Sequence, residues 1–342
     1  MNDNNKYISI PHTDIHLFCL VLGTANAGVK YDEKEFYEIL EKYIYYGGNI
    51  VDTASVYSDW VCGEKSRSEK LIGNWIQKEN KRKDLIILTK GGHPTFIDGI
   101  ANMHKPRLDI ENMRNDLENS LRNLKTDYID IYCFHRDDRT KEVDELIDMM
   151  ETFRKEGKIR YYACSNWDVE RIKRADEYCS AKGYRGFIAN ECMYNIACQY
   201  VQMQDSTLHK IDEAMIRYHM KNKSNIPIAY SSNCSGFLYH YKDKQDDMYR
   251  VSEAIKLAQI IENFSKESRY SITQIALSYI YNMKISCIPI YEPKNFKQIE
   301  EIMKWIRNCE FSKNVEDIMK RIQDICRDES LKIDYKESGV RV

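Results

Sequence analysis

The chain has 342 residues, of which 43% are hydrophobic and 30% are charged, and its formal net charge is −2. These values fit a globular protein with a sizeable core and give no reason to expect nucleic acid or a membrane surface as a partner. No apolar run approaches the roughly 20 residues of a membrane span, and the polar start "MNDNNKYISIPHTD" lacks the apolar core of a secretory signal. We therefore expect a cytoplasmic protein.

The chain contains 11 cysteines without CxxC or CxxH spacing. This pattern argues against a zinc site and a full disulfide framework and favours buried free thiols in a reducing compartment. We expect no metal site. Cys62, Cys133, Cys164 and Cys234 fall near the predicted mouth of the fold, and their reactivity depends on exposure and local pKa.

Short apolar or β-branched runs recur along the chain, and most are continuous, as in strands buried on both faces. The predicted strands cover residues 18–23, 49–54, 85–90, 128–135, 159–166, 187–195, 226–232 and 286–290. The predicted helices between and after them cover residues 32–46, 68–78, 109–124, 143–158, 168–182, 206–221 and 271–284. Gly157 and Gly183 stand where helices usually stop.

This alternation favours a parallel sheet with helical crossovers, closed into a (β/α)8 TIM barrel of the α/β class. Ahead of the first strand, "YISI" and "IHLF" flank "PHTD" and could form a β-hairpin that closes the barrel floor. The second architecture considered is a doubly wound sheet. Against it, "LGTANAG" after the first strand has the wrong spacing for a GxGxxG dinucleotide turn.

Further helices are expected outside the eight units. One helix-like stretch lies in the long gap between the seventh and eighth strands, and two more, near 295–307 and 315–326, follow the eighth strand. No Pro/Gly/Ser-rich linker divides the chain. We therefore expect one domain over residues 1–342, with a barrel core at about 5–305 and a C-terminal helical extension at 306–342.

Candidate functional residues gather at the carboxyl ends of the predicted strands, where barrel enzymes carry their sites. Asp52 and Tyr57 follow the second strand, Lys90 ends the third, and His135 ends the fourth. Each residue alone has an ordinary structural explanation. Because all four are expected at the same end of the barrel, together they indicate a functional site.

Seven motifs resemble, in order, those of the aldo-keto reductase superfamily: "LGTANAG", "GGNIVDTASVY", "SEKLIG", "LTKGG", "SLRNLKTDYIDIYCFHRDD", "GKIRYYACSNW" and "IPIAYSSNCSGFL". The resemblance covers about residues 5–305 and implies hydride transfer from a reduced nicotinamide cofactor to a carbonyl carbon. It implies that Tyr57 is the general acid and that Lys90 lowers its pKa. Asp52 would hold Lys90, and His135 would orient the carbonyl.

The cofactor contacts are implied by the same resemblance. Ser165 and Asn166 match the pair that binds the nicotinamide carboxamide, and Tyr230 matches the aromatic residue that stacks on its ring. Glu191 stands where the family usually has a glutamine. The remaining motif positions that we assign to the cofactor are Gly23, Thr24, Ser231, Gly236 and Leu238.

The segment "PIYEPKNFKQIEEIMKW" after the eighth strand departs from the family pattern for the adenine end of the cofactor. Tyr291 replaces a glycine, Gln298 stands near the usual arginine, and Glu301 fits one alignment. Lys294 and Lys297 could supply charge to a phosphate. NADP is therefore the expectation from the family, with NAD as the alternative.

The substrate contacts are expected on the loops above the barrel, from Trp60, His93, Arg136 and Trp167. A rim with aromatic and charged groups suits a keto-sugar or another small carbonyl compound. Asp137 and Asp138 either bind hydroxyl groups there or serve the next helix.

The leading interpretation is a reversible NAD(P)H-dependent carbonyl reductase with a small-molecule carbonyl or alcohol substrate. The alternative is a cofactor-binding regulatory protein with little turnover, which Glu191 and the altered adenine segment support. A barrel enzyme of unrelated chemistry would need a metal or phosphate site, and the strand ends show neither motif. Nothing in the pattern indicates an oligomeric state.

Overall fold

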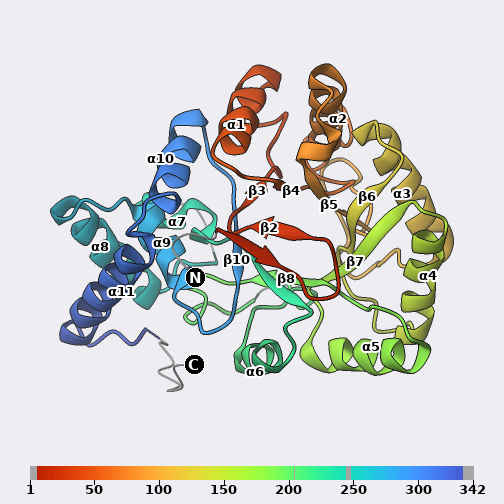
Figure 1. Cartoon of the computed structure of the whole chain (residues 1–342). Coiled ribbons are helices and arrows are strands. Elements are labelled where there is room, and N and C mark those ends of the chain that lie inside the picture. The colour runs from red at the N-terminus through yellow and green to blue at the C-terminus, as the bar shows by residue number, and fades with distance from the viewer. Residues whose placement is uncertain (1–5, 204, 244–247, 334–342) are drawn as a thin grey trace.

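The strands of this protein form a closed parallel barrel. The structure, a computed structural model, describes residues 6–203, 205–243 and 248–333. The barrel strands are β3 (Val21–Gly23), β4 (Ile50–Asp52), β5 (Ile86–Gly91), β6 (Ile129–Phe134), β7 (Ile159–Ser165), β8 (Ala189–Met193), β9 (Ile226–Tyr230) and β10 (Ile288–Tyr291). They close in the order β10-β3-β4-β5-β6-β7-β8-β9, so the predicted (β/α)8 barrel is confirmed (Figure 1). Each predicted run overlaps one barrel strand.

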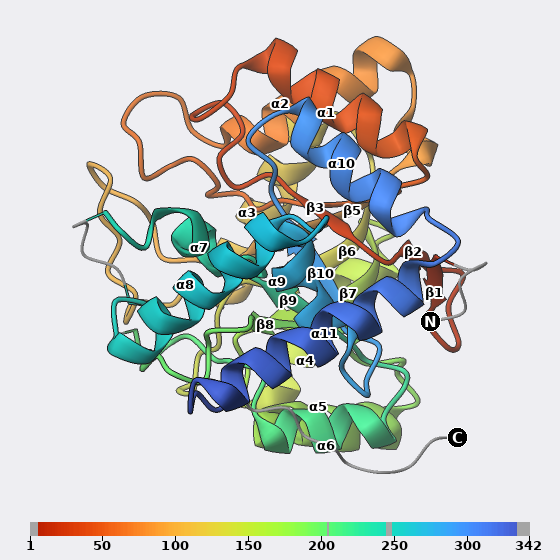
Figure 2. The same ribbon diagram turned by 90° about the vertical axis from the view of Figure 1, so that its left-hand side faces the viewer.

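Helices surround the barrel on its outer side (Figures 1 and 2). They are α1 (Glu33–Tyr45), α2 (Arg67–Glu79), α3 (Ile110–Leu124), α4 (Val143–Lys155), α5 (Val169–Lys182), α6 (Glu213–Lys221), α7 (Phe237–His240), α8 (Ser252–Glu267), α9 (Ile272–Tyr281), α10 (Phe296–Ile306) and α11 (Phe311–Asp328), with 3-10 turns η1 (Arg82–Asp84) and η2 (Cys234–Gly236). Helix α8 is the predicted extra helix. Helix α11, from the predicted C-terminal extension, packs against α8 and α9. Residues 334–342 of that extension lie outside the described residues.

Side-chain caps set several helix boundaries. Asp32 forms a capping box with Glu35 at the start of α1, and the Asp109 and Asp168 carboxylates cap α3 and α5. The prediction of a helix from residue 206 was wrong, because α6 begins at Glu213 after the cap Asp212. The backbone before that cap bonds to β8 instead, through Met193 N to His209 O and Ile211 N to Met193 O, at 3.0 Å each.

A β-hairpin closes the amino-terminal end of the barrel, as predicted. Its strands β1 (Tyr7–Ser9) and β2 (His16–Phe18) pair antiparallel and lie across that end in Figure 1. Ile10, Ile15 and Leu17 are buried and belong to the same apolar cluster as the inward-facing barrel residues. The barrel therefore has an apolar floor, and its accessible end is the carboxyl end.

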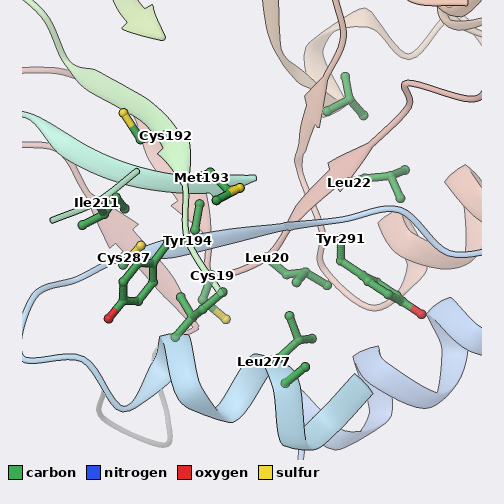
Figure 3. Packing of buried hydrophobic residues seen from close by; sticks show 14 of the residues in the cluster. Cys19, Leu20, Leu22, Cys192, Met193, Tyr194, Ile211, Leu277, Cys287 and Tyr291 are labelled. Atoms are coloured by element: carbon green, nitrogen blue, oxygen red, sulfur yellow. The ribbon is translucent and has the colours of Figure 1, made fainter. Parts of the chain in front are cut away.

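A second apolar layer lies between the barrel and the helices. Figure 3 shows Leu277 of α9 pointing toward Leu20, which lies just before β3. Tyr194 and Tyr279 stack in the same layer, with ring centroids 5.4 Å apart. The 11 cysteines are free; Cys62 and Cys309 are exposed and the other nine are buried, which agrees with the expectation of buried thiols. In the described parts of the chain, no helix is long and apolar enough to cross a membrane.

Gly73 offers a test of the packing between α2 and α3. A Cβ at this position would lie 2.0 Å from the backbone oxygen of Asn123. We expect Gly73→Ala to lower the free energy of unfolding by about 2 kcal/mol, because overpacking outweighs the roughly 1 kcal/mol that alanine gains in a helix. Urea denaturation measures this change. Asn74→Ala, at the next position of α2, is the control and should change stability by less than about 0.5 kcal/mol; equal effects of the two substitutions would contradict the packing argument.

Candidate active site

A cavity of about 840 Å³ opens at the carboxyl ends of the strands. Most of the residues that the sequence assigned to the site line it. These are Gly23, Asp52, Tyr57, His135, Arg136, Ser165, Asn166, Glu191, Tyr230, Ser231, Gly236, Lys294 and Gln298. Among the described residues, no group of three or more His, Cys, Asp or Glu side chains is placed to hold a metal ion.

Seven assigned residues are absent from the cavity lining: Lys90, Trp60 and His93, which contact residues that do line it, and four others. Trp167 is fully buried between Phe134 and Phe187, with ring centroids 5.6 and 5.2 Å away, so it belongs to the core and we withdraw it as a substrate contact. Leu238 is also buried in the core. The remaining two are Thr24, which is buried and donates to the Asp52 backbone oxygen at 2.7 Å, and Glu301, which is exposed on α10.

The two aspartates after His135 have internal partners. Arg171 binds both carboxylate oxygens of Asp137, at 2.9 and 3.0 Å. Asp138 accepts bonds from the backbone and hydroxyl of Thr140. These partners are internal, but they do not belong to the next helix, α4, whose N-cap is Glu142; Arg171 lies on α5.

Lys90 is the centre of the site. Its ammonium is fully buried, forms an ion pair with Asp52, and donates to the Tyr57 hydroxyl at 2.8 Å and the Thr53 carbonyl at 3.2 Å. The Tyr57 hydroxyl in turn donates to the second Asp52 oxygen at 3.1 Å. The strand register explains why Asp52 and Lys90 lie together. Asp52 pairs with Leu88 across β4 and β5, and Lys90 lies two residues further along β5 on the same face.

The charge states follow from burial and these neighbours. Burial lowers the pKa of Lys90, but Asp52 and Glu191 outweigh this effect and raise the pKa well above its usual value. Burial and the Asp52 carboxylate raise the pKa of Tyr57 well above 10, against an opposing effect of Lys90. The sequence-based expectation of a lowered Tyr57 pKa is therefore not met in this state. Tyr57 is a neutral phenol beside a charged ammonium.

Five aromatic rings contact one another beside the cavity, and we call Tyr57, Trp60, His93, Phe96 and His135 the aromatic wall; Tyr57 and His135 line the cavity. Successive ring contacts close into a cycle: Tyr57–Trp60 at 6.4 Å, Trp60–Phe96 at 6.3 Å, Phe96–His93 at 5.3 Å, His93–His135 at 4.6 Å and His135–Tyr57 at 5.8 Å. Burial lowers the pKa of His135 well below its usual value and that of His93 to about 4. Both imidazoles are therefore neutral at neutral pH.

Glu191, on β8, faces the same ammonium from the opposite side. Its Oε1 lies 3.4 Å from Lys90 Nζ, and its Oε2 is buried without a hydrogen-bond partner in the described structure. Burial and the negative charge of Asp52 raise the pKa of Glu191 to about 8, against the effect of Lys90. At neutral pH the carboxyl is therefore mostly protonated. It offers one O–H and one C=O, as a glutamine offers an N–H and a C=O.

The polar pair after β7 is held rigidly. Asn166 has a left-handed backbone (φ 62°), its Nδ2 donates to Ser165 Oγ at 2.9 Å, and its Oδ1 accepts from the Tyr230 hydroxyl at 2.8 Å. The backbone N–H of His209 also donates to this Oδ1, at 3.2 Å. This support from His209 was not predicted, since it comes from the irregular segment before α6.

Glu292, which follows β10, bonds to the segment after β3 at the end of the cavity that contains Lys294, and we call this the far end. Its carboxylate accepts from the backbone and side-chain nitrogens of Asn26 and from the Tyr31 hydroxyl, each at 2.6 Å. Sequence reasoning noted the unusual segment around it but assigned no role to Glu292. Lys294 lies nearby, with its Nζ 3.1 Å from His240 Nε2, and its backbone donates to the Gln298 side chain at 2.7 Å.

Comparison with known proteins agrees with this geometry. A sequence profile of the Aldo/keto reductase family matches residues 19–325, so the protein belongs to this family of oxidoreductases, whose members generally use NAD(P)H. "Uncharacterized oxidoreductase YrpG" and "Aldo-keto reductase YhdN", both from Bacillus subtilis (strain 168), are each 25% identical to the chain, over 94% and 92% of it and over 95% and 94% of their own lengths. An NADP(+)-specified aryl-alcohol dehydrogenase from Phanerodontia chrysosporium is 26% identical over 54% of the chain and 50% of its own length.

The raised pKa of Glu191 gives folding stability a pH dependence that Glu191→Gln removes. Between 4.5 and about 8 the folded state holds a proton that the unfolded state has lost, so wild-type stability falls as the pH rises through this window. We expect the melting temperature of Glu191→Gln, relative to wild type, to rise from about pH 5 to about pH 8.5 and then level off.

The control for this experiment is Glu41→Gln, an exposed position on α1. Its melting temperature should follow that of wild type at every pH. A constant difference between Glu191→Gln and wild type across the window would show that Glu191 does not change its protonation there.

Proposed function

We propose that this protein reduces the carbonyl group of a small aldehyde or ketone to an alcohol with NAD(P)H, and catalyses the reverse oxidation. The observation that carries the proposal is the position of Lys90 Nζ, which contacts both the Tyr57 hydroxyl at 2.8 Å and the Asp52 carboxylate at the cavity. The nicotinamide supplies the hydride when bound. The protein must then supply a proton to the carbonyl oxygen.

Tyr57 is the proton donor in this proposal. It is protonated in the resting site, and its hydroxyl reaches the cavity beside the neutral imidazole of His135. As negative charge develops on the carbonyl oxygen, the phenol gives up its proton, and the ammonium of Lys90 stabilises the resulting phenolate. Asp52 keeps Lys90 charged and in place, and His135 orients the carbonyl.

The residues beside Tyr57 fit a nicotinamide group. Ser165, Asn166 and Glu191 present hydrogen-bonding groups to one wall of the cavity, and the Tyr230 ring lies next to them. The unpartnered Oε2 of buried Glu191 supports this assignment, since a buried polar atom normally has a partner. A carboxamide would supply that partner.

The far end of the cavity supports NADP as the cofactor. Lys294 lines this end, and its ammonium contacts His240 Nε2 at 3.1 Å but forms no ion pair with a carboxylate of the described residues. The nearby Glu292 is occupied by Asn26 and Tyr31. The Lys294 ammonium is therefore available to a phosphate, and Gln298 and the exposed Lys30 line the same region.

The alternative function, cofactor binding without turnover, was supported in the sequence by Glu191 and by the altered segment after the eighth strand. A protonated Glu191 can form the hydrogen bonds of a glutamine, so this residue does not favour the regulatory alternative. We keep carbonyl reduction as the proposed function.

Tyr57→Phe tests the proton donor. We expect kcat/KM for aldehyde reduction to fall by about 10²–10⁴-fold, because the proton transfer is lost while the ring remains in place. The dissociation constant for NADPH, measured by fluorescence titration, should change by less than about threefold, since no cofactor contact is removed. Tyr178→Phe, at an exposed hydroxyl bonded to Asp148, is the control. Undiminished turnover by Tyr57→Phe would exclude the mechanism.

Lys294→Met tests the cofactor preference. Removing the charge while keeping the length of the side chain should weaken NADPH binding by about tenfold and leave NADH binding nearly unchanged, because only NADPH carries a 2′-phosphate for Lys294 to contact. Titrations with both cofactors give the two dissociation constants. Lys304→Met, on the outer side of α10 and paired with Glu300, is the control. Equal losses for both cofactors would remove Lys294 from the phosphate site.

A further inference from the structure

Arg136 is a charged residue of the cavity that the proposed proton transfer does not use. It directly follows His135 after β6 and lines the cavity together with Tyr57 and Tyr230. Its Nε is buried without a hydrogen-bond partner. In the part of the chain that the structure describes, no hydrogen bond or ion pair joins the Arg136 guanidinium to another residue.

Three other partly or fully buried arginines of the protein have carboxylate partners, whereas Arg185 donates to the backbone oxygens of Pro11 and Ser224. Arg171 binds Asp137 through two nitrogens, Arg82 pairs with Asp130 at 2.8 Å, and Arg107 pairs with Asp116. A buried charge is costly unless it is paired and hydrogen-bonded. The Arg136 guanidinium thus lacks the counterion that these three arginines have.

The nearby carboxylates form no ion pair with Arg136 among the described residues. Asp205 is close enough to act on Arg136 electrostatically, but its Oδ1 accepts from the Thr207 backbone at 2.8 Å and hydroxyl at 2.6 Å. Glu191 and Asp52 face the Lys90 ammonium. Burial lowers the pKa of Arg136, as expected for a cation without a close counterion, although a guanidinium stays charged at neutral pH.

The position of Arg136 separates it from the adenine end of the cofactor site. It follows β6, whereas Lys294 follows β10, and these two strands are four places apart in a ring of eight. They therefore lie on opposite sides of the barrel mouth. A phosphate bound at Lys294 leaves Arg136 on the side of Tyr57 and His135.

We propose that Arg136 binds an anionic group of the substrate, a carboxylate or a phosphate, so that the substrate is a carbonyl compound with a negative charge near the reacting group. This inference rests on the proposed function. The planar guanidinium binds either anion through two parallel hydrogen bonds. Tyr57 and His135, the two members of the aromatic wall that line the cavity, supply ring faces for the carbon skeleton. This substrate class replaces the keto-sugar expectation, since Asp137 and Asp138 are engaged internally.

Matched carbonyl compounds test the inference by activity. The pairs are 4-carboxybenzaldehyde with benzaldehyde, and glyceraldehyde 3-phosphate with glyceraldehyde. We expect wild type to favour the anionic member of at least one pair by about tenfold or more in kcat/KM, and Arg136→Met to lose that preference while reduction of the neutral member changes by less than about threefold. Arg136→Lys keeps the positive charge but not the planar guanidinium with its two parallel N–H donors, so it should retain part of the preference.

The activity experiment has a control variant and outcomes that would contradict the inference. Arg139→Met is the control, because Arg139 is exposed and pairs with Asp168 on the surface. It should keep the wild-type preference. No preference for an anionic member in wild type, or equal losses for both members in Arg136→Met, would overturn the inference.

A binding experiment separates this inference from the proposed function. Benzoate and phenyl phosphate, with benzamide as the neutral comparison, are titrated into wild type and Arg136→Met in the presence of NADPH, and binding is followed by tryptophan fluorescence. Saturable binding of either anion that Arg136→Met weakens at least about tenfold supports the anion site, even if wild type reduces no carbonyl compound. Equal binding to both proteins, or an NADPH dissociation constant raised about tenfold by Arg136→Met, would overturn it.

Discussion

The buried ammonium of Lys90 is the charge on which the rest of the site depends. Three acidic groups, Asp52, Tyr57 and Glu191, converge on it from β4, the following loop and β8. One ammonium can balance one full negative charge, and Asp52 provides it. Burial and the Asp52 charge raise the pKa of the other two groups, so both keep their protons at neutral pH. The closed barrel places β8 opposite β4, so the protonation pattern depends on the fold.

The difference between local signals and contacts between distant segments explains which parts of the fold could be predicted. Continuous apolar runs and the helix-stopping Gly157 and Gly183 are local signals, and they located the barrel strands and the ends of α4 and α5. The residues at the strand ends, such as Asp52 and Lys90, followed from the rule that barrel sites lie there. The start of α6 was missed because residues 206–211 bond to β8, a contact between distant segments that has no local signal.

Other errors in the predicted site concern which way a side chain points and which residue it pairs with. Ser165 and Asn166 line the cavity while the next residue, Trp167, packs outward against Phe134 and Phe187, and a list of adjacent residues does not show this reversal. The pairing of Asp137 with Arg171 spans 34 positions of sequence. For Tyr57, the sequence named the neighbours correctly but could not rank burial and Asp52 above Lys90.

The hairpin that closes the barrel has a consequence for the chemistry above it. Ile10, Ile15 and Leu17 join the inward-facing apolar residues of the strands, which leaves no polar path from the barrel floor to Lys90 through the described residues. The cavity therefore opens at the carboxyl ends of the strands and is closed at the other end. In the proposed reaction Tyr57 must recover its proton from the same side on which the alcohol departs, so solvent access and product release share a single route.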